Sequence, residues 1–193
     1  TNYVGGFAGY VVGNGSISNA YETGAVIASN STNGGVGGFA GYLDTNFNGT
    51  ISNFYETGSV SGQSNLGGLI GYAARGNVSN GYAIGYLTSS TNSAVGASFG
   101  FLNTSNSAGN FAVNRNNLFF DNQTTNILTD QLGGGGNSNV SGATGCTTAQ
   151  MQTGTLLANL PSSNWTATAG LFPYLTSIYS SAPTAISGYA YLS

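Results

Sequence analysis

Carboxylates are the side chains in this sequence with the clearest potential for chemistry, because the chain has five acidic residues, two basic residues and no His. Glu22 and Glu56 occupy the same place in two copies of a repeated Tyr-Glu-Thr-Gly block, whereas a third copy has Ala83 there. A carboxylate pair could act as general acid and base or bind calcium. Like charges at this spacing repel unless they are solvated, so we expect Glu22 and Glu56 to point outward.

The other candidate groups do not cluster. Asp121 and Asp130 stand alone, whereas a calcium loop needs several carboxylates at close alternating positions. Lyases and hydrolases built on β-helices combine clustered acids with Lys, Arg or His. The four Gly at 133–136 are not followed by the Lys of a phosphate loop. We therefore predict no catalytic, cofactor-binding or metal-binding residues and a protein that is not an enzyme.

The lone Cys146 cannot form an internal disulfide, and a structural zinc site needs several Cys or His ligands. We predict that Cys146 is a small, buried, apolar packing residue.

Charge excludes two classes of partner. The formal net charge is -3, and the two basic residues are Arg75 and Arg115, which give no electrostatic basis for binding nucleic acid or an anionic membrane. No apolar run approaches the roughly 18 residues that span a bilayer, and the first residues do not show a charged n-region followed by an apolar h-region. We expect no membrane insertion, and a fragment whose targeting signals lie elsewhere.

The elements that must position these residues are set by an internal repeat. A first block of Gly and apolar residues begins at Val4, Val36, Leu66 and Val95, which are 32, 30 and 29 residues apart. A second block follows the first three copies, as Ile17-Ser18-Asn19-Ala20-Tyr21, Ile51-Ser52-Asn53-Phe54-Tyr55 and Val78-Ser79-Asn80-Gly81-Tyr82. The Gly pairs of the first block indicate tight corners that need a positive φ or close backbone approach.

Strands fit this repeat better than helices, because Gly in nearly every block costs about 1 kcal/mol per residue in a helix. In the second block alternate residues match, as the two-residue period of a strand requires. We predict an all-β, right-handed parallel β-helix with coils of about 30 residues. Asn19, Asn53 and Asn80 should stack as an amide ladder, with the Tyr columns in the core.

The repeats resemble GLUG motifs, which occur in large bacterial surface proteins related to filamentous haemagglutinin. Gly68-Leu69-Ile70-Gly71-Tyr72 and the Ser-Asn-x-Tyr-x-x-Gly blocks carry the resemblance, which covers about residues 4–101. The first two repeats have Phe where the motif has Leu. Residues 117–124 and 145–151, with Trp165 and Pro173-Tyr174-Leu175, are similar to the segments that follow such repeats in these adhesins.

This resemblance implies a protein secreted by a Gram-negative cell, often by a two-partner route, with a role in adhesion or biofilm formation. Cys146 stands where the family pattern usually has Leu, which agrees with a packed thiol.

Three regions follow from the sequence. Residues 1–102 hold the solenoid repeats. Residues 103–179 hold an irregular coil, a Gly-rich loop and a capping segment, in which Thr147 starts a short helix that covers the end of the stack together with Leu156, Leu157 and Leu160. Residues 180–193 form a linker that enters a new strand.

We expect an extracellular or cell-surface adhesin or structural module whose partner is a host or neighbouring cell surface. Two alternatives stay open. One is a subunit of an extracellular filament that self-associates through solenoid ends or the C-terminal strand, and the other is a glycan-binding module with outward aromatic residues as its site.

Overall fold

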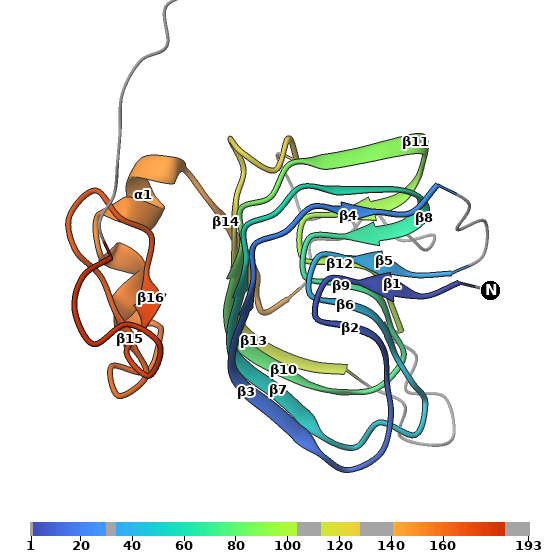
Figure 1. Cartoon of the computed structure of the whole chain (residues 1–193), viewed down its shortest axis with the longest axis horizontal. Helices are drawn as coiled ribbons and strands as arrows, with labels where there is room; N and C mark the ends of the chain where they lie inside the picture. The colour runs from blue at the N-terminus through green and yellow to red at the C-terminus, as the bar shows by residue number, and fades with distance from the viewer. Residues whose placement is uncertain (1, 30–33, 104–112, 128–140, 184–193) are drawn as a thin grey trace, which may run out of the picture.

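The computed structural model describes residues 2–29, 34–103, 113–127 and 141–183, with the side chains of Asn92, Ser93, Thr155 and Leu157 left aside. Three parallel sheets wind around a common axis as a β-solenoid with coils about 30 residues apart (Figure 1). The predicted fold class, an all-β parallel solenoid, is confirmed. No helix in the described ranges is long and apolar enough to cross a bilayer.

Successive strands join the three sheets in turn, so the middle coils contribute one rung to each sheet. Sheet C has the order β14-β13-β10-β7-β3, with β3 Ser16–Glu22, β7 Thr50–Glu56, β10 Gly76–Ala83, β13 Val113–Asp121 and β14 Ala143–Cys146. Sheet B has the order β12-β9-β6-β2, with β2 Ala8–Val11, β6 Ala40–Leu43, β9 Ile70–Ala73 and β12 Phe99–Leu102. Sheet A contains β1 Val4–Gly5, β4 Val26–Ile27, β5 Val36–Gly37, β8 Val60–Gly67 and β11 Leu87–Gly96.

The pairing is in register with the repeats, so equivalent residues stand next to each other. Tyr21 pairs with Tyr55, and Tyr55 with Tyr82. A further rung lies beyond the recognisable repeats, because β13 continues the ladder with Phe119 beside Tyr82.

The Asn of the second block has a backbone role that the repeat pattern did not reveal. Asn19, Asn53, Asn80 and Asn117 all have positive φ, between 51° and 55°. Asn tolerates this left-handed conformation better than most residues. It reverses the alternation of side chains at one point in β3, β7, β10 and β13 of sheet C.

This reversal corrects the prediction that the Tyr columns fill the solenoid core. Ile51 before the Asn and Phe54 after it both point into the core, where they pack with Val78 and Leu118. Tyr55 and Tyr82 point to the other face of sheet C and belong to a different cluster. A simple period of two would have placed Ile51 and Tyr55 on the same face.

Asn19, Asn53 and Asn80 stack in register as predicted, but the side-chain bonds found at these positions join them to other residues. Asn117 Nδ2 donates to Asn80 Oδ1 at 3.1 Å. The side-chain oxygens of Asn53 and Asn19 instead accept from Trp165 Nε1 at 3.3 Å and from Asn164 Nδ2 at 3.2 Å.

The Gly pairs are explained by close backbone approach. A Cβ on Gly37 would meet the carbonyl oxygen of Ala40 and lie 2.5 Å from the amide nitrogen of Gly71. Neither Gly37 nor Gly38 is among the residues with positive φ. The alternative of a positive φ is therefore wrong for this pair.

The C-terminal region forms a lid of α1 Thr148–Gln152, the 3₁₀ helix η1 Thr155–Ala158 and the antiparallel pair β15 Trp165–Thr166 and β16 Tyr174–Leu175. The predicted N-cap is confirmed, because Thr147 and Gln150 form a reciprocal capping box. The lid covers the outer face of sheet C rather than the end of the stack (Figure 1). The prediction of an end cap was wrong because it assumed that the Tyr columns were already buried inside.

We expect Asn80→Ala to lower the free energy of unfolding by about 2 kcal/mol, from left-handed backbone strain and the lost bond to Asn117. Asn80→Gly should cost about half as much, because Gly adopts the conformation without strain. Asn77→Ala, which removes a side-chain bond to Asn114, is the control. Urea denaturation measures all three, and equal losses for Asn80→Ala and Asn77→Ala would contradict the strain argument.

Candidate functional site

The Glu22 and Glu56 carboxylates are the first candidate site. The two residues pair directly between β3 and β7, so they lie close together as predicted. Glu56 is fully buried, with 0% of its surface exposed, and Glu22 is partly buried. The prediction that both point into solvent was wrong for Glu56, because the positive φ at Asn53 turns Glu56 toward the inside of the coil.

Glycines make room for these acids. A Cβ on Gly6 would lie 2.5 Å from Glu22 Cδ, and a Cβ on Gly38 would meet the Cγ of Glu56. The Glu22 Oε1 accepts a hydrogen bond from the amide of Gly24. Both side-chain oxygens of Glu56 are buried without a hydrogen bond of normal geometry in the described part of the chain.

Burial raises the pKa of the Glu56 carboxyl well above its usual value of 4.5, and the nearby negative charge of Glu22 adds to this effect. The backbone amides of Gly85 and Gly58 lower that pKa in part. Burial also raises the pKa of Glu22. The folded state therefore favours a protonated, neutral Glu56, so the expected repulsion between two stacked carboxylates does not arise.

Geometry argues against catalysis or metal binding by this pair. A substrate cannot reach Glu56, which has no exposed surface. In the described ranges, no group of three or more His, Cys, Asp or Glu side chains is placed to hold a metal ion. Glu56 lies in the interior of the coil, and Glu22 lies beside it, partly buried.

Glu56→Gln should stabilise the protein at pH 8 and leave it unchanged at pH 4. A raised folded-state pKa gives a contribution that is fully present below the unfolded pKa and is lost as pH rises through the folded pKa. We expect the melting temperature at pH 8 to rise by about 3 °C or more. Thermal unfolding followed by circular dichroism across pH 4–9 measures the difference.

The control is Asp44→Asn. Hydrogen bonds, first that from Tyr10, lower the pKa of Asp44, so its contribution is present above the unfolded pKa and lost on acidification. This variant should be destabilised at pH 8. A Glu56→Gln effect independent of pH would contradict buried protonation.

Asp44 and Asp121 are turn residues. Asp44 accepts from the Tyr10 hydroxyl and from the Asn46 amide nitrogen at 2.8 Å. Asp121 is buried and accepts from the Gln123 amide at 2.8 Å and the Thr148 hydroxyl at 2.6 Å. Sequence reasoning did not single out Asp44, although Asp-Thr-Asn is a typical sequence for such a turn.

The remaining candidates from the sequence are Cys146, Asp130 and the Gly-rich stretch 133–136. Cys146 is buried and packs in the lid cluster, which confirms the predicted packing role. Burial, followed by the charge of Asp121, raises the pKa of its thiol, so the thiol is held in its unreactive protonated form. Asp130 and the Gly-rich stretch 133–136 lie outside the described residues.

The lid interface is the second candidate site. Tyr55, Tyr82 and Phe119 on the outer face of sheet C pack against a group of lid side chains, namely Met151, Leu156, Leu160, Trp165 and Leu175. The Tyr82 hydroxyl donates to the Pro173 carbonyl at 2.7 Å. Burial raises the pKa of Tyr82 well above 10.0, so it stays a neutral donor. Trp165, which is only 2% exposed, is the central anchor.

We expect Trp165→Ala to lower the free energy of unfolding by about 3–5 kcal/mol, as for other large buried aromatic residues. Trp165→Phe should recover most of the loss. Denaturant unfolding by circular dichroism measures both variants. In the wild type the fluorescence of Trp165, the single Trp of the chain, follows lid opening directly. A loss below 1 kcal/mol for Trp165→Ala would contradict its role as anchor.

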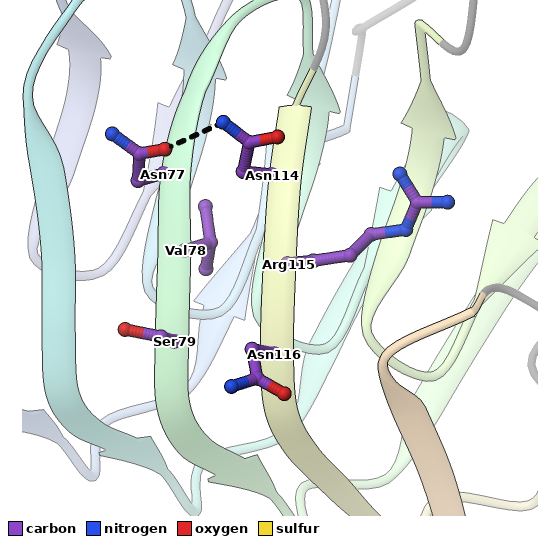
Figure 2. A pocket seen from close by; sticks show the side chains of 6 residues that line it. All are labelled: Asn77, Val78, Ser79, Asn114, Arg115 and Asn116. Atoms are coloured by element: carbon purple, nitrogen blue, oxygen red, sulfur yellow. Dashed lines mark hydrogen bonds between the residues drawn. The ribbon is translucent and has the colours of Figure 1, made fainter.

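The third candidate site is a groove on the solvent side of sheet C, formed by residues of β10 and β13 (Figure 2). Its volume is about 210 Å³, and its lining residues are Asn77, Val78, Ser79, Asn114, Arg115 and Asn116. Asn114 Nδ2 donates to Asn77 Oδ1 at 2.8 Å. Figure 2 shows Arg115 pointing away from these amides, and its guanidinium donates to the carbonyls of Ser141 and Val113. The groove thus combines neutral amides and a hydroxyl with a mainly apolar accessible lining, which suits an uncharged ligand that has both polar and apolar groups.

Comparison of the chain with protein-family models, with curated proteins and with solved structures gives no match. The resemblance to GLUG repeats therefore rests on the residues quoted for it.

Proposed function

We propose that this chain is a non-enzymatic, secreted β-solenoid module that mediates adhesion to a host or neighbouring cell surface. The support comes from the distribution of charge. Of the six charged residues in the described ranges, Asp44, Glu56 and Asp121 are buried, and Glu22, Arg75 and Arg115 are partly buried. In the described ranges no charged side chain is fully exposed, so the surface consists of hydroxyl and amide groups with some exposed apolar side chains, and it contacts other surfaces without charge selectivity.

The groove on β10 and β13 supports this role because it brings uncharged amides and an apolar lining together at one place. Asn114 and Asn116 are exposed there, and Ser79 lies beside them. An extracellular location and a Gram-negative source are part of the proposal, and they rest on the resemblance to surface adhesins.

Glycan binding is a second candidate, and the groove favours it more than the aromatic residues do. Sugars stack on the faces of aromatic rings, but the rings in the inner coils use their faces on one another, whereas Phe7 and Tyr21 of the first coil each keep one face open. Tyr72 and Phe101 stack at 4.4 Å and Tyr3 and Tyr42 at 4.3 Å. The amide groove is therefore the better candidate for contacts to sugar hydroxyls.

The test is the retention of beads coated with the full chain, under flow, on epithelial cell monolayers and on immobilised dextran. Asn114→Ala combined with Asn116→Ala should lower retention on cells at least threefold. The matched control is Thr88→Ala with Ser90→Ala, an exposed pair with the same spacing on β11 of sheet A.

Retention on cells but not dextran supports a cell-surface receptor, and retention on both supports glycan binding. Equal retention of the groove and control variants contradicts the groove as the contact. Release of reducing sugar from dextran contradicts a non-enzymatic module.

A further inference from the structure

The first coil of the solenoid presents an open edge. β2 and β3 are each the last strand of their sheet, and β1 and β4 end sheet A on the same side. One side of each strand therefore carries backbone groups that pair with no other described strand. Such an edge is a template for strand addition.

Large apolar side chains are exposed along this edge. They are Phe7 at 49%, Tyr10 at 50%, Val12 at 54%, Tyr21 at 39% and Ile27 at 69% exposed. One coil further in, the equivalent of Phe7 is covered, since Phe39 is 0% exposed. A further rung would bury the edge in the same way.

Aromatic columns also end here. Phe7 stacks on Phe39 with ring centroids 4.7 Å apart and planes at 4°, and Tyr21 stacks on Tyr55 at 5.2 Å and 14°. Each first-coil ring uses one face on its neighbour. Its second face is available to a residue of the same kind on an added strand.

A matching strand sequence occurs in this same chain. Ile186-Ser187-Gly188-Tyr189-Ala190 follows the pattern of β6 with the residue before it, Phe39-Ala40-Gly41-Tyr42-Leu43, and of β9 with the residue before it, Leu69-Ile70-Gly71-Tyr72-Ala73. In each segment an apolar residue is followed by a small or apolar residue, Gly, Tyr and an apolar residue. The stretch 184–193 lies outside the described residues and contains no charge.

We propose that a second copy of this chain supplies Ile186–Leu192 as an additional parallel strand on the open edge of β2. By the register of sheet B, Tyr189 lies beside Tyr10 and Ala190 beside Val11, and Ile186 covers Phe7. Backbone hydrogen bonds supply affinity and the alternate side chains supply register, as in other β-augmentation. This self-association goes beyond adhesion and does not depend on it.

The strand comes from another copy because the tail of the same copy is too short. The described chain ends at Pro183, after the lid, which lies on the outer face of sheet C (Figure 1). β2 lies across the core from the lid, two layers away, and packed layers are about 10 Å apart. The three steps from Pro183 to Ile186 span only about 10 Å when fully extended.

Sedimentation of the full chain from micromolar to millimolar concentration tests the proposal. We expect concentration-dependent oligomers. Ile186→Asp with Tyr189→Asp should raise the dissociation constant at least tenfold, and Ser180→Asp with Ser181→Asp, which adds two charges outside the strand, should change it less than twofold. A monomer at every concentration, or equal effects of both pairs, would overturn the proposal.

Disulfide trapping identifies the donor. In a Cys146→Ser background, a mixture of Tyr10→Cys and Tyr189→Cys chains should give a cross-linked heterodimer, with little homodimer from either chain alone. A chain that carries both substitutions and closes on itself at nanomolar concentration would show pairing within one copy and overturn the proposal. Bead retention should not change with Ile186→Asp and Tyr189→Asp, so failure of this proposal and of the adhesive role are distinguishable.

Discussion

In-register pairing between successive coils is the constraint on which the rest of this structure depends. Each residue lies beside its own equivalent one coil away, so any side chain type that recurs becomes a column. Columns of apolar or aromatic residues gain contact from this repetition, whereas columns of like charge lose stability. A low content of charged residues suits this stacking, because each repeated charge would lie beside a like charge. Glu22 and Glu56 are two acids that lie side by side in this stacking. The fold tolerates them because burial favours a neutral carboxyl on Glu56.

A second constraint acts within each rung of sheet C. The left-handed asparagine reverses the side-chain alternation, so that residues on both sides of it face the core and the following Tyr faces outward. An outward column of Tyr55, Tyr82 and Phe119 would be an exposed apolar patch on a solvent face. The lid removes that patch, and its Trp165 bonds directly to Asn53. One backbone angle thus sets both the shape of the core and the need for a C-terminal lid.

Much of the fold could be predicted from the sequence because repeats report stacking directly. The parallel solenoid, the coil length, the Thr147 cap and the burial of Cys146 followed from spacing and residue type. The direction of Tyr55 and Glu56 could not be predicted, because a period of two assumes uniform strand backbone and Asn53 breaks it. The groove depends on β13, whose sequence departs from the repeat. Only its pairing with β10 places Asn114 and Asn116 beside Asn77 and Ser79.

The interruption of sheet A in the first coil shows how freely this scaffold can change. β8 is a single strand, but β4 and β5 face it as two, with eight residues at 28–35 where the next coil has four at 62–65. The added length leaves the register on both flanks intact. A coil of this kind can therefore accept foreign peptide between these two strands, which makes the position a practical one for epitope display.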